Sequence, residues 1–232
     1  MMAWYARGDD FKDTTYECLI TPGSGRVDVS SWFGPNRNDG PKFTLIEKNP
    51  LINLPYVVDH EDDVVVTQSN ACMQYLARKL GRDLYGVTAK HAVECDQLLC
   101  QIMDLRNAAV GLFYGSGSRK AYEAGVEKHL RTTLGHYKKL EAWLASRNGK
   151  GGEGATFFVL DDAPTAPDFH AWEMLDQHEA VVKDLGRDSL LGGEFPRLSK
   201  FYSAFKKVPE LKGYFDSDAA KFPINNPQAA FK

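Results

Sequence analysis

The sequence predicts two unlike halves, an α/β domain followed by an all-α helical bundle. Before about Val66, short runs rich in β-branched residues alternate with turn residues. Beyond about Leu84, apolar residues recur at helical spacing over two segments that exceed the usual length of a globular helix. The chain of 232 residues, 43% of them hydrophobic, is long enough to bury a substantial core. We expect the α/β domain over residues 1–82, the helical domain over 89–217 and a C-terminal tail over 218–232.

The first half contains strand signals and one helix signal. Thr14–Ile20 is a β-like run that a turn rich in Gly, Pro and Ser closes. Two β-branched runs, Tyr56–Asp59 and Val64–Val66, are joined by a short acidic link and predict a hairpin. A helix that ends at Gly81 should follow. Its apolar residues recur at helical spacing, at Ala71, Cys72, Leu76 and Leu80.

The second half predicts two long amphipathic helices, over Ala89–Phe113 and Arg119–Ser146. The first should bury a stripe made of Val93, Leu98, Ile102, Leu105, Ala109 and Leu112. The second should bury Val126, Leu130, Leu134, Tyr137 and Leu144. The glycine-rich segment Asn148–Gly154 contains Gly-Lys without a following Ser or Thr, so we interpret it as a flexible connection and not as a phosphate loop.

A helix start is predicted at Thr165-Ala166-Pro167-Asp168. Thr165 can cap the helix, and Asp168 stands at the position from which a carboxylate reaches back to the capping amide. We interpret this motif as a folding signal. Two short helices, Phe195–Lys206 and Pro209–Phe215, should follow before an irregular tail.

Composition excludes several classes of protein. The net charge of −3 is unlike that of proteins that gather phosphates or anionic lipid, so we expect neither a nucleic-acid partner nor a membrane partner. No apolar run approaches the length that spans a bilayer, and the N-terminus lacks a secretory pattern. The four cysteines are too few for a disulfide framework. These features favour a cytoplasmic location.

The sequence predicts no metal site. His170, Glu173, His178 and Glu179 lie close in sequence, but the two histidines are two helical turns apart, too far to share one ion. We interpret all four as polar surface residues. The glycine patterns of α/β-hydrolases and of dinucleotide-binding domains are absent from the sequence.

Two short motifs, one on each side of the predicted hairpin, are more specific. Asn53-Leu54-Pro55 stands just before the first strand, and Thr67-Gln68-Ser69 stands between the second strand and its helix. Ser69 can cap that helix, and the free amides at a helix start form a ready anion site.

With these motifs, the sequence resembles the cytosolic glutathione transferases that use a catalytic tyrosine, such as the mu and sigma classes. The matching stretches are Asn53–Tyr56, Thr67–Ala71, Tyr75–Lys79, Gln101–Asp104 and Thr165–Phe169. The resemblance implies a thioredoxin-like N-terminal domain, a helical C-terminal domain and assembly as a homodimer. It also implies glutathione as co-substrate and a hydrophobic small-molecule electrophile as its partner in the reaction.

The resemblance also assigns roles to residues. The glutathione-binding set that it implies is Trp32, Lys42, Asn53, Leu54, Pro55, Gln68, Ser69 and Asp104. A cis peptide bond before Pro55 would let the Leu54 backbone pair with the cysteinyl residue of glutathione. Gln68 and Ser69 would hold the γ-glutamyl carboxylate, and Asp104 of the partner subunit would approach the γ-glutamyl amine.

Three further assignments concern the two ends of the bound molecules. Trp32 resembles a tryptophan near the glycine end of glutathione, and Lys42 stands where a lysine would pair with the glycine carboxylate. Tyr114 resembles a tyrosine that lines the electrophile pocket, although a core aromatic residue at a helix end is an equal interpretation.

The catalytic tyrosine of such enzymes lies on a first strand, which a helix of about a dozen residues follows. Only 13 residues precede Thr14, too few for both elements. Either Trp4–Gly8 is that strand and Tyr5 is the activating residue, or Tyr5–Phe11 matches the end of the first helix. The second alignment requires only a shortened start and is favoured, so we expect the first strand and most of the first helix to be missing, and glutathione binding and turnover to be weak.

Three functions agree with this pattern. The first is a glutathione transferase that joins the glutathione thiolate to hydrophobic electrophiles. The second is a non-catalytic binding or structural protein of the same fold, and the third is a glutathione-dependent isomerase. The ordered motifs favour the first function, and nothing in the sequence separates an isomerase from a conjugating enzyme.

Overall fold

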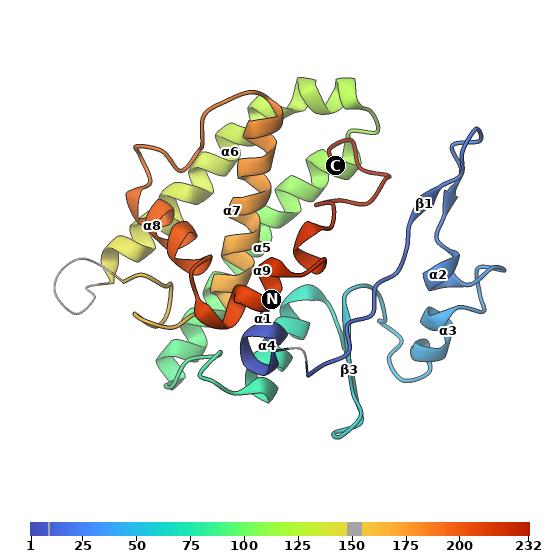
Figure 1. Cartoon of the computed structure of the whole chain (residues 1–232), viewed down its shortest axis with the longest axis horizontal. Coiled ribbons are helices and arrows are strands. Elements are labelled where there is room, and N and C mark those ends of the chain that lie inside the picture. The colour runs from blue at the N-terminus through green and yellow to red at the C-terminus, as the bar shows by residue number, and fades with distance from the viewer. Residues whose placement is uncertain (9, 148–154) are drawn as a thin grey trace.

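The computed structural model describes residues 1–8, 10–147 and 155–232. The predicted connection Asn148–Gly154 lies outside these residues. The first half is α/β, and beyond residue 88 the described residues form helices and loops (Figure 1). The elements of the first half are α1 (Met2–Arg7), β1 (Leu19–Ile20), β2 (Val27–Asp28), α2 (Ser30–Phe33), α3 (Pro41–Ile46), β3 (Tyr56–Asp59), β4 (Val64–Thr67) and α4 (Ser69–Leu80). Those of the second half are α5 (Ala89–Gly115), α6 (Arg119–Ser146), α7 (Ala166–Asp184), α8 (Pro196–Phe205), η1 (Pro209–Leu211), α9 (Lys212–Asp216) and η2 (Ala219–Lys221).

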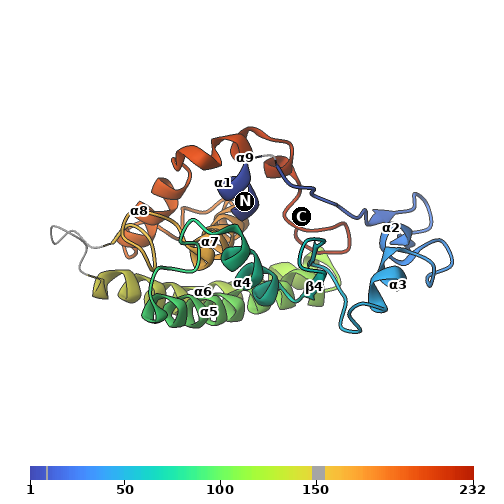
Figure 2. The ribbon, with the colours of Figure 1, turned by 90° about the horizontal axis from the view of Figure 1, so that it is seen from below.

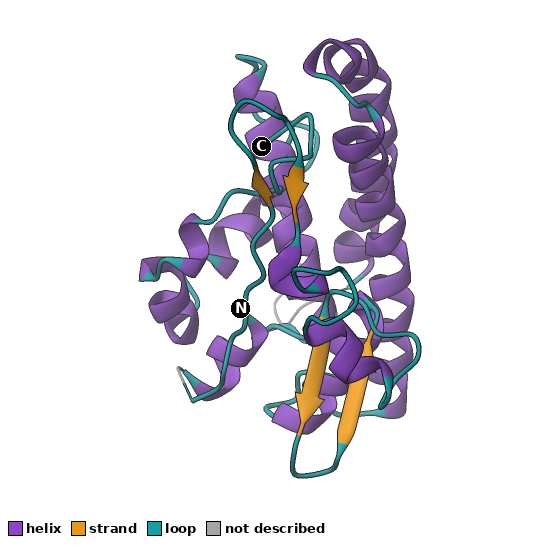
Figure 3. Ribbon diagram, turned by 90° about the vertical axis from the view of Figure 1, so that its right-hand side faces the viewer, coloured by secondary structure: helices purple, strands orange, loops and turns teal. Residues whose placement is uncertain are grey.

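The strands form two separate antiparallel pairs, β1 with β2 and β3 with β4 (Figure 3). The β3–β4 hairpin and α4 agree with the predicted hairpin and helix. The predicted run Thr14–Ile20 is a strand only at Leu19–Ile20, because the ladder with β2 contains just two residue pairs. The β1–β2 hairpin, α2 and α3 project from the helical bundle on one side (Figures 1 and 2).

Helix α4 is held against the β3–β4 hairpin by polar contacts of Asp59. The Tyr75 hydroxyl donates to the Asp59 carboxylate at 2.7 Å, and Lys79 lies 3.1 Å from the same carboxylate. These contacts hold the second half of α4 against the hairpin, and its N-terminus follows the end of β4 directly along the chain. The fold therefore delivers the start of α4 to the edge of the hairpin.

The two long helices α5 and α6 agree with the predicted segments and lie side by side, with α7 packed over them (Figure 2). The apolar stripe of α5 is buried at Leu98, Ile102, Leu105 and Ala109. Val93 was predicted to belong to this stripe, and that prediction is wrong, because Val93 is 63% exposed. The helical period shows which residues share a face of α5, but it does not show whether another element covers that face.

Helix α7 begins with the predicted capping box. The Asp168 carboxylate accepts hydrogen bonds from the amides of Phe158 and Thr165, both at 2.8 Å, and from the Thr165 hydroxyl at 2.6 Å. Burial raises the pKa of Asp168 to about 6, while these donors favour its ionised form. The motif therefore fixes both the start of α7 and the loop that carries Phe158.

The prediction that His170 and His178 lie on the surface is wrong, because α7 is packed on several sides and both residues are buried. His178 Nδ1 donates to the Met174 carbonyl at 2.6 Å, so its Nε2 accepts a hydrogen bond from the His129 Nε2–H at 3.0 Å. The two rings stack between α6 and α7. This hydrogen bond requires a neutral His178, and burial lowers the pKa of both imidazoles.

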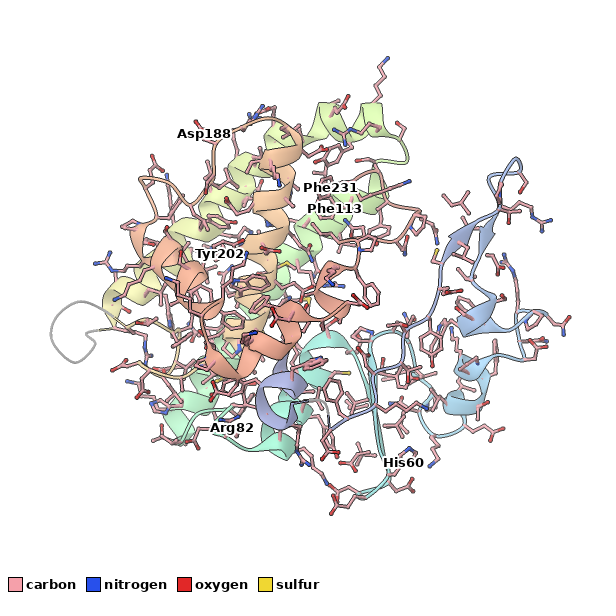
Figure 4. The ribbon with its side chains drawn as sticks, viewed as in Figure 1. His60, Arg82, Phe113, Asp188, Tyr202 and Phe231 are labelled. Atoms are coloured by element: carbon pink, nitrogen blue, oxygen red, sulfur yellow. The ribbon has the colours of Figure 1, made fainter. Side chains whose placement is uncertain are left out.

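The tail packs on the end of the bundle where α5 ends and α6 begins. Phe231 stacks on Tyr122 and contacts Phe113, and the Ala230 amide donates to the Phe113 carbonyl at 2.7 Å (Figure 4). The tail was predicted to be irregular, and η2 is its only helical turn among the described residues. Among those residues, no helix combines the length and the apolar character that crossing a bilayer requires.

Removing the Asp168 carboxylate should strongly destabilise the fold. In Asp168→Ala the buried amides of Phe158 and Thr165 lose their acceptor, so we expect a loss of about 3 kcal/mol, against about 1 kcal/mol for Thr165→Ala. Urea unfolding followed by circular dichroism measures both. Asp188→Ala, at an exposed loop carboxylate, is the control and should change stability by less than about 0.5 kcal/mol (Figure 4). Equal stability of Asp168→Ala and the wild type would contradict the capping role.

Acid should weaken the contact between α6 and α7. The unfolded chain protonates histidine below about pH 6.5, whereas the folded pair stays neutral to lower pH, so stability should fall as the pH falls through this range, by about 1–2 kcal/mol per pH unit. Urea unfolding of the wild type and of His129→Leu/His178→Leu at pH 7.5 and 5.5 measures the slope. The double variant should show a shallower slope, and His60→Gln, at an exposed turn, should keep that of the wild type. A slope that the double variant leaves unchanged would refute the role of the pair.

Candidate functional site

The two motifs that flank the β3–β4 hairpin meet at the side chain of Thr67, the last residue of β4. Thr67 is 5% exposed. Its hydroxyl accepts a hydrogen bond from the Asn53 amide at 3.2 Å and lies 2.7 Å from the Asn53 carbonyl and 3.1 Å from the Pro55 carbonyl. The loop Asn53–Pro55 is therefore joined to the residue that precedes Gln68.

The Leu54–Pro55 peptide bond is cis, as the resemblance implies. Leu54 is 45% exposed, and its N–H and C=O form no hydrogen bond with another described residue. An unpaired donor and acceptor on one exposed residue can pair with the backbone of an extended peptide.

Helix α4 starts differently from the prediction. Ser69 was predicted to be the N-cap, but Gln68 is the N-cap and Ser69 is the first helical residue. The reason is that the chain turns at Gln68 with a φ of 77°, a left-handed conformation that costs a non-glycine residue about 1–2 kcal/mol. The Ser69 hydroxyl forms no hydrogen bond with a described residue, and the first amides of α4 have no intrahelical acceptor. This helix start is suited to bind an anion.

Trp32 is buried beside this site, on α2. Its ring stacks on Tyr56, the residue after Pro55, with centroids 5.6 Å apart, and it meets the ring of Tyr16 at 4.9 Å. The Tyr16 and Tyr56 hydroxyls are 2.5 Å apart. The indole N–H of Trp32 has no partner among the described residues. Three aromatic residues thus fill the space between α2 and the start of β3.

Lys42 lies on α3, next to α2. Its ammonium stands 5.0 Å from the centre of the Phe33 ring. The turn between the two helices is tight, because a Cβ added at Gly40 would lie 2.2 Å from the Gly34 amide. Lys42 therefore belongs to the same substructure as Trp32, and it forms no ion pair within the described residues.

Asp104 does not meet the other predicted residues within this chain. It is exposed on α5 and lines a surface pocket between α5 and α6 together with Lys139 and Trp143. It shares one exposed stripe of α5 with Val93 and Cys100, which lie at helical spacing from it.

Tyr114 stands at the C-terminal end of α5 and is 37% exposed, so it is not a core residue. Its hydroxyl accepts a hydrogen bond from the Asn226 amide at 3.2 Å. Tyr114 is therefore linked to the tail, and Gln228 of the same tail segment contacts Cys18 near β1.

Tyr5 lies on helix α1 and not on a strand, so the condition for its catalytic assignment is not met. The residue is buried, its ring packs against Phe169, and the Arg82 guanidinium lies 4.6 Å above it. Burial raises the pKa of Tyr5. Arg82 follows the C-terminal end of the 12-residue α4, whereas Ser69 begins it, so the two ends are about 18 Å apart.

Two contributors to the site were not identified from the sequence, Thr67 and Tyr16. Thr67 was recognised only as part of a motif, and Tyr16 only as part of a strand run. Burial raises the pKa of Tyr16 to about 12, and its hydrogen bond with Tyr56 acts in the same direction, so this phenol stays protonated. A hydroxyl residue directly ahead of Gln68 is the one local signal that could have pointed to Thr67.

Comparison with known proteins gives consistent matches. Residues 32–78 match the family model "Glutathione S-transferase, N-terminal domain", and residues 103–218 match "Glutathione S-transferase, C-terminal domain". Glutathione S-transferase Mu 3 of Homo sapiens is 30% identical over 226 residues, which cover 95% of this chain and 85% of that protein.

Solved structures agree. The Pi-class glutathione S-transferase of Onchocerca volvulus matches with a TM-score of 0.62 and 26% identity, over 80% of this chain and 81% of that one. The structure of the glutathione S-transferase Blo t 8 matches with a TM-score of 0.66 and 24% identity, over 99% of this chain and 92% of that one, which shows the shared fold.

Proposed function

The chain belongs to the glutathione S-transferase family, with that family's thioredoxin-like N-terminal domain and helical C-terminal domain, and we propose that it binds glutathione in a cradle formed by Leu54, Gln68 and Ser69. The predicted resemblance to glutathione transferases is thereby confirmed, and the chain is a transferase by homology. One observation carries the proposal. The unpaired N–H and C=O of Leu54 and the free amides at the start of α4 lie on segments that the Thr67 hydroxyl joins.

Each part of the cradle suits one part of the tripeptide. The free N–H and C=O of Leu54 would pair with the backbone of the cysteinyl residue. The Ser69 hydroxyl and the first amides of α4 would hold the γ-glutamyl carboxylate, which gains about 0.3–1 kcal/mol from the helix dipole. The exposed Gln68 side chain would contact the neighbouring polar groups.

Trp32 and Lys42 would serve the glycine end of glutathione. The unpartnered indole N–H is a hydrogen-bond donor, and Lys42 supplies a positive charge on the adjoining helix. At the other end of the molecule, Tyr114 would border the hydrophobic electrophile, with its hydroxyl held by the tail.

The cradle residues should be needed for retention on immobilised glutathione. Gln68→Ala/Ser69→Ala removes the side-chain contacts to the γ-glutamyl group, so we expect at least a tenfold weaker retention than for the wild type. Gln177→Ala/Ser203→Ala changes the same residue types on α7 and α8 and should bind as the wild type does. Equal retention of the cradle variant and the wild type would refute the site.

The exposed stripe on α5 supports a homodimer. Val93 and Asp104 lie on one face of α5, and an apolar side chain that is 63% exposed gains from coverage by a second subunit. Asp104, which does not meet the cradle of its own chain, would then approach the γ-glutamyl amine bound by its partner.

Asp104→Asn should weaken glutathione binding only if the protein is a dimer. We expect a dimer by light scattering and a loss of affinity of about fivefold by calorimetry, because a charge-assisted contact to the amine becomes a neutral one. Asp188→Asn, at an exposed carboxylate remote from α5, is the control. A monomer whose affinity nevertheless depends on Asp104 would contradict the assignment.

One observation favours a second candidate, a glutathione-binding protein without conjugating activity. Tyr5, the residue considered for thiol activation, packs against Arg82 just beyond the C-terminal end of α4, whereas Ser69 of the cradle begins that helix. Thioether formation from glutathione and a hydrophobic electrophile distinguishes a transferase from such a binder, and product analysis distinguishes both from an isomerase. The four free thiols support a reducing compartment such as the cytoplasm.

A further inference from the structure

Thr67 lies behind the cradle and not in it. Its side chain is buried, and all the partners of its hydroxyl are backbone atoms of Asn53 and Pro55, the two neighbours of Leu54. Its own chain neighbour is Gln68. One hydroxyl group therefore links the backbone on both sides of Leu54 to the residue that begins the α4 side of the cradle.

The chemistry of a single hydroxyl suits this arrangement. Its oxygen accepts from the Asn53 amide while its one proton is shared between the carbonyls of Asn53 and Pro55. A valine has almost the same shape as threonine but offers neither a donor nor an acceptor. Replacement by valine therefore removes the hydrogen bonds and leaves the Asn53 N–H and the carbonyls of Asn53 and Pro55 without this partner.

Other contacts hold the loop less directly. The Asn49 side chain donates to the Val65 carbonyl at 2.9 Å, which fixes the loop four residues before Asn53. The ladder between β3 and β4 begins only at Tyr56. The Cys72 thiol lies 3.6 Å from the Pro55 carbonyl, at the long end of hydrogen bonds to sulfur. Leu54 lies between these contacts. The Thr67 hydroxyl is the group that hydrogen-bonds to the residues on both sides of Leu54.

We propose that Thr67 is a positioning residue for glutathione, whose hydroxyl sets the distance between the Leu54 backbone and the start of α4. The inference rests on the proposed glutathione site. A tripeptide that must engage both surfaces at once binds best when they are already at the right separation, because it then does not have to order the loop on binding. Loss of the hydroxyl should weaken binding although no group that touches glutathione has changed.

Calorimetry with reduced glutathione on the full chain tests this, with Thr67→Val, Thr67→Ser and Thr133→Val. We expect about tenfold weaker binding for Thr67→Val and recovery to within about twofold of the wild type for Thr67→Ser, which restores the hydroxyl. Thr133 is the matched control, because it is fully buried on α6 and its hydroxyl donates to the His129 carbonyl at 3.1 Å. Thr133→Val should lose stability and keep its glutathione affinity.

The outcomes separate the two proposals. A wild type that does not bind glutathione overturns the proposed function. A wild type that binds, with a folded Thr67→Val of equal affinity, overturns only the role of Thr67, and so does an equal loss of affinity in Thr133→Val. Should Thr67→Val fail to fold, hydrogen exchange of the wild type decides, because the Asn53 amide must then be as protected as the amides of the β3–β4 ladder, and rapid exchange at Asn53 refutes the contact.

Discussion

The burial of α7 is the constraint on which the rest of the structure depends. Because the helix is packed on several sides, polar groups on its inner faces need partners inside the protein; Asp168 and His178 have them, whereas His170 Nδ1 has none among the described residues. At its start, the Ala166 amide donates to the Leu84 carbonyl at 2.8 Å, which ties α7 to the segment that follows α4. This hydrogen bond joins the start of α7 to the chain just beyond α4, whose N-terminus forms part of the proposed cradle.

Local sequence signals were sufficient for most elements of the fold. Helix α6 was predicted with its observed limits because it carries a long apolar stripe and a glycine-rich segment follows it. The predictions for Val93 and His178 were wrong because they too relied on local sequence signals alone. Periodicity shows which residues share a face, but it does not show how many other elements cover that face, and α7 is covered on more sides than its own pattern indicates.

The candidate site could be predicted as a set of residues but not as an arrangement. The motifs containing Leu54 and Gln68 were visible in the sequence, whereas the hydroxyl of Thr67 that joins them acts across 14 residues. The start of α4 was misplaced by one residue because the left-handed backbone of Gln68 is a property of the turn and not of the residue type. Such contacts depend on how distant segments pack, so a single sequence does not reveal them.

Binding and activation of the thiol make different demands on this chain. In the proposed site, binding would use backbone groups and a helix start, which the fold itself supplies at Leu54 and Ser69. Activation needs a hydroxyl within hydrogen-bond distance of the sulfur, and the sulfur must lie next to Leu54, where the cysteinyl residue would pair. Tyr5 packs against Arg82, beyond the opposite end of α4 from Ser69, and the Tyr16 hydroxyl is already hydrogen-bonded to Tyr56, with its pKa raised to about 12. In the proposed site, the groups that would hold the tripeptide are therefore distinct from any group that would ionise its thiol, and the two properties are separable by measurement.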